Sequence, residues 1–254
     1  MTSKQIAFLG ATGDCAGFCL ANALKAGYNC TALARTPQKL SDSLIAKGVS
    51  EDDISQHLTI VEGNAKDIEA MKKVLTRNNT VVDLIVSGIG GTPTLQWSLY
   101  KPVVLTDPRV CLDAGTTVLH ALAELKAQKK PVLINVSTTG INPPGTPNDV
   151  PLAFNLLYHW MLQDPHEDKL ALERHLGEHV QRDDSVLSGH VQVKASLLMN
   201  GESLGLQSIR QGIDEKPAVG YTIRRSDVGL WMFEKLIKQD VPREWINKGL
   251  TITY

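Results

Sequence analysis

The 254-residue sequence predicts an α/β fold, a single doubly wound domain built around a mostly parallel sheet. Short apolar runs alternate with helix-length segments, and glycines follow the first run at once. We find no linker, internal repeat or low-complexity tract that would divide the chain. Hydrophobic residues make up 43% and charged residues 21% of the sequence, which is typical of a globular protein with a sizeable core.

The predicted elements follow one another in the order of βαβ units. Apolar runs predict strands over residues 5–9, 30–34, 58–61, 81–86, 132–136, 191–195 and 250–253. Helical spacing predicts helices over residues 16–26, 110–129, 166–180 and 226–238. Gly27 is a plausible C-cap of the first helix, and Thr36 precedes Pro37 as the expected N-cap of another. Strands separated by helices indicate a parallel sheet covered on both faces.

The domain changes character near its middle. Residues 1–140 have the pattern of a cofactor-binding half, and residues 141–254 that of a substrate-covering half that is not an independent domain. The proline-rich segment 142–151 is expected to be a loop. The apolar segment 152–162 that follows can be a lid over a hydrophobic substrate or part of the core, and both interpretations stay open.

A glycine-rich segment joins the first strand to its helix. Gly10 and Gly13 can supply the tight turn and the close backbone approach that a dinucleotide diphosphate needs at a helix N-terminus. Ala16 stands where helix and strand must pack closely, with Gly17 beside it. Asp14 is an acid beside the expected diphosphate and must point away from it. The residues of this loop that we expect to hold a cofactor are Gly10, Thr12, Gly13, Ala16 and Gly17.

The end of the second strand predicts which dinucleotide is preferred. An NAD site would place an acidic residue there to bind the ribose hydroxyls, but this chain has Arg35 and Thr36, with Lys39 one turn later and no acid before Asp42. A guanidinium group can pair bidentately with a 2′-phosphate. The sequence therefore predicts NADP(H), although Arg35 can also be a solvated loop residue.

Several segments together resemble the atypical short-chain dehydrogenase/reductase superfamily, in particular its NAD(P)H-binding or NmrA-like branch. These are Gly10-Ala-Thr-Gly13, Leu33-Ala-Arg35-Thr-Pro, Val61-Glu-Gly63-Asn64-Ala65-Lys-Asp67, Val86-Ser87-Gly88-Ile89-Gly90-Gly91, Leu133-Ile-Asn-Val-Ser137-Thr138 and Tyr221-Thr-Ile-Arg224-Arg225-Ser226-Asp227-Val228. The resemblance covers nearly the whole chain and implies a Rossmann-like fold. Its motifs specify cofactor binding better than chemistry.

The resemblance also implies roles for individual residues. Gly63, Asn64 and Ala65 would contact the adenine, although relatives commonly have Asp at the position of Asn64. Ser137 and Thr138 would face the nicotinamide, and Lys169 would touch its ribose. The segment expected to pass under the cofactor ribose consists of Ser87, Gly88, Ile89 and Gly90.

The catalytic residues depart from the usual pattern. Short-chain dehydrogenases use Tyr-x-x-x-Lys, in which the lysine lowers the tyrosine pKa for proton transfer. Here Pro165 stands four residues before Lys169, so this pair is absent. Ser137, Tyr158 or His159 could donate the proton, or solvent could do so. With Lys169, these are our candidate catalytic residues.

Other sites and settings are not favoured by the sequence. His175 and His179, with Glu178 between them, spell an inverted zinc motif, but Gly177 and the surface-type helix end argue against a metal. The four cysteines lack metal or redox spacing and are expected in the core. A net charge of −1 argues against nucleic-acid binding, and no apolar run reaches membrane-spanning length. We expect a cytoplasmic monomer or homodimer.

The function that fits these observations is NADPH-dependent reduction of a small or medium apolar carbonyl, enone, quinone or flavin-like substrate. Two alternatives stay open. The chain can be a non-redox, NmrA-like regulator or sensor that binds NAD(P), or an isomerase or cyclase that uses the bound cofactor as a scaffold.

Overall fold

A single eight-stranded sheet runs through the computed structural model, which describes residues 4–91, 93–95, 103–143, 145–151 and 163–254. All neighbouring strands of this sheet are parallel except the edge strand β12. In spatial order the strands are β12 (Arg210–Ile213), β14 (Lys248–Thr253), β10 (Gly189–Ala195), β9 (Val132–Thr138), β6 (Leu84–Ser87), β1 (Gln5–Leu9), β2 (Asn29–Ala34) and β3 (Leu58–Glu62). This arrangement confirms the predicted α/β, Rossmann-like fold with a mostly parallel sheet.

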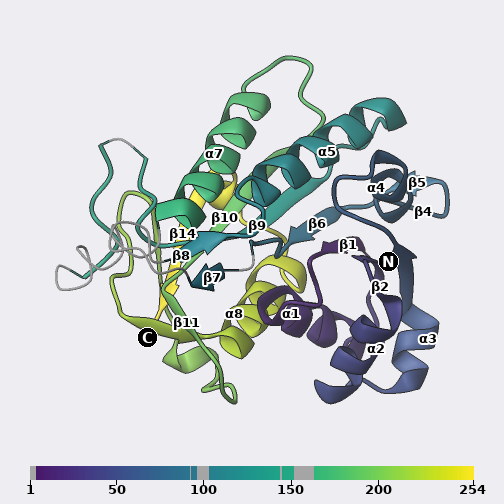
Figure 1. The fold of residues 1–254 in the computed structure, drawn as a ribbon, viewed down its shortest axis with the longest axis horizontal. Helices are drawn as coiled ribbons and strands as arrows, with labels where there is room; N and C mark the ends of the chain where they lie inside the picture. Colours follow the sequence, from purple (N-terminus) through teal and green to yellow (C-terminus); the bar gives the residue numbers. More distant parts are fainter. Residues whose placement is uncertain (1–3, 92, 96–102, 144, 152–162) are drawn as a thin grey trace.

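Helices cover both faces of the sheet (Figure 1). One face carries α1 (Asp14–Lys25), α2 (Pro37–Ala46), α3 (Glu51–His57) and α8 (Arg225–Met232), and the other carries α4 (Ile68–Val74), α5 (Val110–Leu125) and α7 (Gln163–Val180). Side chains of β1 alternate between the two layers, because successive residues of a strand point to opposite faces. Ile6 and Phe8 pack in the α1–α8 layer, whereas Ala7 and Leu9 pack in the α4–α5–α7 layer.

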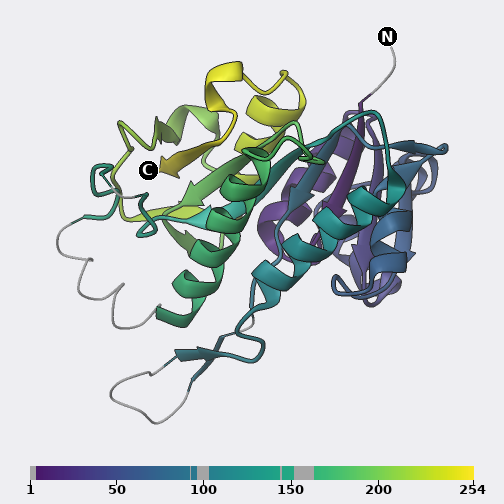
Figure 2. The ribbon, with the colours of Figure 1, turned by 90° about the horizontal axis from the view of Figure 1, so that it is seen from above.

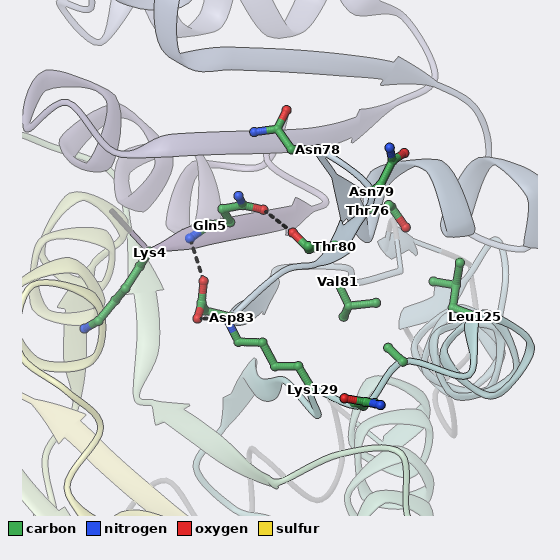
Figure 3. Close-up of a pocket in the computed structure, with 12 residues that line it drawn as sticks. Lys4, Gln5, Thr76, Asn78, Asn79, Thr80, Val81, Asp83, Leu125 and Lys129 are labelled. Atoms are coloured by element: carbon green, nitrogen blue, oxygen red, sulfur yellow. Dashed lines mark hydrogen bonds and ion pairs between the residues drawn. The ribbon is translucent and has the colours of Figure 1, made fainter. Parts of the chain in front are cut away.

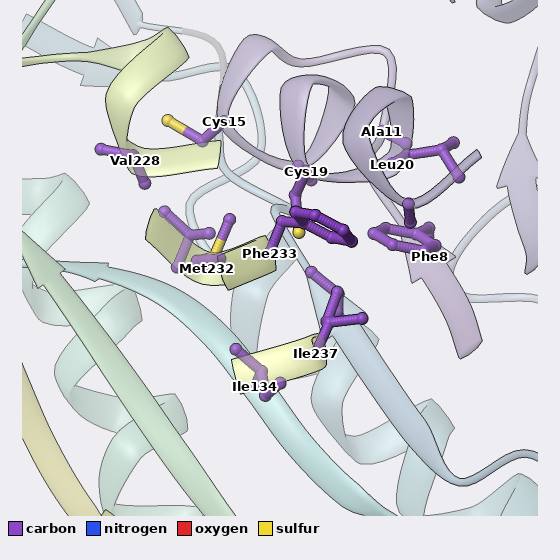
Figure 4. Close-up of a cluster of buried hydrophobic side chains, with 14 of the residues drawn as sticks. Phe8, Ala11, Cys15, Cys19, Leu20, Ile134, Val228, Met232, Phe233 and Ile237 are labelled. Carbon is purple, nitrogen blue, oxygen red and sulfur yellow. The ribbon is translucent and has the colours of Figure 1, made fainter. Parts of the chain in front are cut away.

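The α1–α8 layer is closely packed (Figure 4). A Cβ atom on Gly229 of α8 would lie 2.7 Å from Cys19 N and 2.8 Å from Cys15 O, both on α1, so a glycine is needed where the helices meet. Cys15, Cys19, Cys30 and Cys111 are all buried and free, as predicted. Burial raises the pKa of each thiol, to about 12 for Cys15 and Cys111, so these side chains stay neutral core residues.

The fourth predicted strand was wrong in its extent. Residues 81–86 do not form one strand, because the chain first makes a hairpin of β4 (Thr76–Arg77) and β5 (Thr80–Val81). Asn78 and Asn79 connect them with φ angles of 51° and 59°, the left-handed conformation that two-residue hairpin turns require. β6 therefore begins at Leu84, three residues after the predicted start of the strand at residue 81.

Helix ends also differ from the prediction. α5 ends at Leu125 instead of residue 129, because Lys126 adopts a left-handed φ of 46°. α8 ends at Met232, where a π-helical turn, η2 (Phe233–Ile237), continues the predicted helix. Two helices of seven residues, α3 and α4, were not predicted, although Ser50 and Asp67 accept hydrogen bonds from their first-turn N–H groups as ordinary N-caps.

Smaller elements lie around the sheet. An arm formed by β7 (Pro93–Leu95) and β8 (Val103–Leu105) follows the carboxyl end of β6 and extends away from the main body (Figure 2). The other small elements are β11 (Leu197–Met199), β13 (Thr222–Arg224) and the 3-10 turns η1 (Leu206–Ser208) and η3 (Arg243–Trp245). Among the described helices, none is both long and apolar enough to cross a membrane.

Candidate active site at the carboxyl edge of the sheet

The glycine-rich loop lies between β1 and α1, at the carboxyl edge of the sheet. Gly10 has a φ of 71°, and Gly13 N donates to Gly10 O at 3.0 Å, which makes the tight turn. Gly13 is the N-cap of α1, and no described side chain accepts a hydrogen bond from the first-turn N–H groups. These groups are therefore available to an anion, because a helix N-terminus combines free donors with a positive dipole end.

The loop after β6 packs directly against this glycine-rich loop. Gly88 N donates to Leu9 O, and a Cβ atom on Gly10 would lie 2.8 Å from Gly88 C. A Cβ atom on Gly88 would lie 2.6 Å from Ala16 Cβ, and one on Gly17 would lie 2.7 Å from Ala11 O. The small residues at these predicted positions let two strand ends and the first turn of α1 come together.

Asp14 points away from the loop, as the sequence required. Its carboxylate pairs with Lys47 Nζ at 3.1 Å, beyond the end of α2. Lys47 also donates to Ser43 Oγ and lies 4.9 Å from the centroid of the Phe18 ring. The acid is thus neutralised beside the helix instead of opposing an anion at its N-terminus.

The residues predicted to select NADP lie at the carboxyl end of β2. Arg35, Thr36 and Lys39 are all exposed, and Thr36 is the N-cap of α2. Within the described residues Arg35 forms no ion pair. A guanidinium group that forms no ion pair can bind a phosphate without first breaking an existing salt bridge.

The predicted adenine segment follows β3, the next strand along the edge. Gly63 N donates to Ala34 O, and a Cβ atom on Gly63 would lie only 2.4 Å from Ala70 Cβ. Asn64 is exposed, and its Oδ1 accepts from Lys66 N at 3.1 Å, which holds the turn that presents Asn64 and Ala65. These residues thus lie beside Arg35 along the same sheet edge.

The predicted ribose segment has mixed exposure. Ser87 is buried, Gly88 and Ile89 are partly buried, and Gly90 is exposed. Ile89 O accepts from the Cys111 thiol at the start of α5. The segment therefore connects the glycine-rich loop to the start of α5.

Ser137 and Thr138 end β9, two strands away from the glycine-rich loop. Ser137 is 2% exposed, and its hydroxyl donates to the carboxylate of Glu173 on α7. Thr138 is partly buried, and its hydroxyl donates to Thr139 O at 3.1 Å. Open parallel sheets place ligands at the carboxyl ends of their strands, which is where these hydroxyl groups lie.

Lys169 approaches the same strand end from α7. Its Nζ donates to Val136 O at 2.6 Å, next to Ser137. The preceding residue, Asp168, is 4% exposed and accepts from Cys111 N at 2.9 Å and Leu112 N at 3.0 Å. Asp168 thereby caps α5 from another helix, which fixes the position of Lys169.

A buried lysine stands behind Ser137. Lys194 on β10 is paired in register with Ser137 and is 1% exposed. Its Nζ donates to Ile141 O at 2.7 Å and to Asp214 Oδ1 at 3.0 Å, and lies 3.7 Å from Glu173 Oε2. A Cβ atom on Gly249 of β14 would lie 2.6 Å from Lys194 Cε, so glycine leaves the room that the lysine needs.

Sequence reasoning missed Glu173, Lys194 and Asp168. Two signals could have found Glu173 and Lys194, whereas no signal in the sequence singled out Asp168. Lys169 and Glu173 are four residues apart, so they share one face of a helix. Lys194 is a charged residue inside an apolar strand, where an ion is retained only with a partner. Tyr158 and His159, two further candidate catalytic residues, lie outside the described residues.

A large hollow occurs at the opposite edge of the sheet (Figure 3). It has a volume of about 670 Å³ and lies between the β4–β5 hairpin and the segment after α5. Its lining includes Asp83, whose carboxylate accepts from Gln5 N and pairs with Lys129. These pairs hold the amino ends of the strands together, away from the glycine-rich loop.

The possible zinc motif on α7 does not form a metal cluster. In the described parts of the chain, no three His, Cys, Asp or Glu residues are placed to hold a metal ion. His179 Nε2 instead accepts from Val186 N at 3.1 Å, and burial lowers the pKa of this imidazole. The histidine therefore fixes the chain after α7.

The arrangement of the carboxyl edge fits a nicotinamide dinucleotide. The uncapped N-terminus of α1 offers donors for a diphosphate, and Arg35 lies at the end of β2 where a ribose phosphate would come. At the other end of the edge, Ser137 and Lys169 provide a hydroxyl and an ammonium group. The order of the strands places these groups along one line, as an extended dinucleotide needs.

Comparison with known proteins points to the same cofactor. A family model described as NAD(P)H-binding matches residues 10–239. The chain is 45% identical over 264 residues to the reductase pytE of Aspergillus terreus, with 100% of this chain and 99% of that protein covered. It is 32% identical over 285 residues to the oxidase pynE of Aspergillus niger, with 100% and 99% covered.

Solved structures share the fold. A short-chain dehydrogenase/reductase from Veillonella parvula in complex with NADP matches with a TM-score of 0.68 at 13% identity, over 99% of this chain and 94% of that chain. ChuY, an anaerobillin reductase from Escherichia coli O157:H7, matches with a TM-score of 0.64 at 17% identity, over 98% and 96%. At these identities the likeness shows the architecture alone.

Proposed function

Because the chain belongs to the NAD(P)H-binding family, we propose that it is an NADPH-dependent reductase. Its substrate is a small or medium-sized apolar carbonyl, enone, quinone or flavin-like compound. The observation that carries the proposal is the shared strand edge, with the uncapped glycine-rich loop at one end and Ser137 beside Lys169 at the other. The names of the relatives, a reductase and an oxidase, support hydride chemistry.

Different residues along this edge bind different parts of the cofactor. The first turn of α1 binds the diphosphate, Arg35 with Thr36 and Lys39 binds the 2′-phosphate, and Asn64 with Ala65 contacts the adenine. The bound nicotinamide would supply the hydride.

In this proposal Ser137 donates a hydrogen bond to the substrate oxygen, and Thr138 lines the adjacent wall. Lys169 can exchange its bond to Val136 O for a ribose hydroxyl, because its ammonium group carries three donors.

The first experiment is a fluorescence titration with NADPH and NADH, followed by NADPH oxidation assays on quinones, flavins, enones and ketones. We expect tighter binding of NADPH and turnover with at least one class of acceptor. If NADPH binds but no acceptor is reduced, the regulator or the isomerase becomes the better explanation. If neither nucleotide binds, the interpretation of the glycine-rich loop is wrong.

A charge variant tests where the diphosphate binds. Thr12 is exposed in the glycine-rich loop, and Thr12→Glu places a carboxylate there, which would repel the phosphates. Thr59 is exposed on β3, so Thr59→Glu is a control with the same change in net charge. We expect weaker NADPH binding in the first variant only, and equal binding by both would place the diphosphate elsewhere.

A further inference from the structure

The hydroxyl group of Ser137 is held by a carboxyl group from another element. It is hydrogen-bonded to Glu173 on α7, across 36 positions of sequence. Ser137 is 2% exposed and the Glu173 side chain 11%, so water competes little for this bond. A carboxyl group therefore lies one hydrogen bond away from the hydroxyl that the proposed function assigns to the substrate.

The two carboxyl groups around Lys194 are held very differently. Asp214 accepts from Lys194 Nζ at 3.0 Å and from Gly249 N at 2.6 Å, so it is the direct counterion of the buried ammonium. Glu173 Oε2 is 3.7 Å from Lys194 Nζ, and its one hydrogen bond among the described residues is the bond with Ser137. Of the two, Glu173 is the carboxyl group that gains most by taking up a proton, because a buried carboxylate needs more donors than it has.

The protonation state of Glu173 decides what the Ser137 hydrogen can do. When Glu173 is ionised, it can only accept, and the hydroxyl must donate to it. When Glu173 is protonated, it can donate to Ser137 Oγ, and the hydroxyl hydrogen is free for another acceptor. A reductase needs the second state, since the reduced substrate oxygen requires a proton.

We propose that Glu173 is a positioning residue that stores a proton and replaces the one that Ser137 gives to the substrate. This inference rests on the proposed reductase function. The substrate carbonyl is reduced at carbon by the hydride which that function supplies, and its oxygen takes the Ser137 hydroxyl proton as the C=O double bond becomes single. The Glu173 proton moves to Ser137 Oγ, and water then returns a proton to the carboxylate.

The charges around Glu173 support this assignment. Burial raises the pKa of Glu173, and Asp214, in the turn after β12, raises it further. Lys194 on β10, the Ser137 hydroxyl on β9 and, least, Lys169 on the same helix lower it, but burial outweighs them. The carboxyl group thus keeps its proton to a higher pH than an exposed glutamic acid.

A spectroscopic test does not depend on turnover. Infrared titration of the protein without nucleotide is expected to show a protonated carboxyl band that disappears with a midpoint above 4.5, the ordinary glutamic acid value. Glu173→Gln should lose this band. Glu178→Gln, an exposed position on the same helix, should keep it. If the Glu173→Gln and parent spectra share the same protonated carboxyl band, Glu173 is ionised and the proposal is overturned.

The second test is the pH dependence of reduction on a substrate that the parent protein turns over. kcat should fall as pH rises through the pKa of Glu173, because the ionised carboxylate binds the Ser137 hydrogen. Glu173→Gln should lower kcat about 100-fold, a typical contribution of positioned proton transfer, and should remove that pH step while KM stays unchanged. A pH step that survives in Glu173→Gln, or a variant with full kcat, would refute the relay.

The two tests separate this inference from the proposed function. If the parent protein binds NADPH but reduces no acceptor, the reductase proposal and the relay are both wrong. A Glu173 band in the infrared spectrum of the parent then shows that the carboxyl group is protonated and that the proposed function is the part that failed. If reduction proceeds without the Glu173 band or pH step, the reductase stands and the relay alone is wrong. Glu178→Gln should match the parent in both measurements.

Discussion

The buried imidazole of His190 is expected to make the protein less stable in mild acid. His190 lies on β10 and is 6% exposed, with its Nδ1 3.3 Å from Gln192 Nε2. Burial lowers the pKa of His190 from 6.5 to about 4, and the carboxylate of Asp214 opposes this only weakly. The folded protein therefore holds the imidazole neutral at a pH where the unfolded chain protonates it.

The size of the effect follows from this difference. Above pH 6.5 the imidazole is neutral in both states, so it adds no pH dependence. Between 6.5 and about 4 only the unfolded chain takes up the proton, and the free energy of unfolding falls by about 1.4 kcal/mol per pH unit. The total loss attributable to His190 is about 3 kcal/mol, and it ends below about pH 4, where both states are protonated.

Urea unfolding at a series of pH values measures this contribution. His190→Gln replaces the imidazole by a neutral amide that does not titrate, and His120→Gln is the control because His120 is exposed on α5. The stability of the parent should fall relative to His190→Gln by about 3 kcal/mol between neutral pH and about pH 4. If parent and His190→Gln lose stability in parallel, the imidazole is not held neutral in the fold.

Three further predictions concern the candidate site. Arg35→Ala should raise the Kd for NADPH about 10- to 100-fold, which is the contribution of a charge-assisted hydrogen bond, and should leave the Kd for NADH unchanged. An equal effect on both nucleotides would remove the basis for NADP preference. Ser137→Ala should lower kcat at least about 100-fold in steady-state assays with little change in the Kd for NADPH, and full turnover would exclude it as the donor. Gly88→Ala should lower the free energy of unfolding by about 1–3 kcal/mol, since its Cβ atom would lie 2.6 Å from Ala16 Cβ. Adding Ala16→Gly should restore part of that loss in urea titrations, and no restoration would show that another contact is responsible.

The edge strand β12 contains no apolar run and was not predicted. The other seven strands of the sheet were predictable because each is a short apolar run next to a glycine or a cap. The β4–β5 hairpin was not, because strands of two residues have no measurable period, and only the Asn78-Asn79 pair indicated the turn. α5 was predicted four residues too long for a similar reason. Helical spacing continues past Lys126, but the left-handed conformation of that residue ends the helix.

The nucleotide side of the site was more predictable than the chemical side. Gly10 and Arg35 follow the strands that position them, so their place at the sheet edge comes from the order of elements alone. The contact of Ser137 with Glu173 and the ion pair of Lys194 with Asp214 depend on how α7 crosses the sheet and how β12 folds back. Such contacts between distant segments leave no periodic signal in the sequence.

Gly249 restricts which residues can occupy positions 194 and 214 in homologous sequences. Its N–H group holds Asp214, and its missing side chain leaves space for the buried stem of Lys194. A descendant that replaces the lysine by a smaller apolar residue no longer needs the glycine or the aspartate, whereas a side chain at 249 is incompatible with the lysine. We therefore expect positions 194, 214 and 249 to change together among homologous sequences, so that a buried charge is inherited or lost as a set of three.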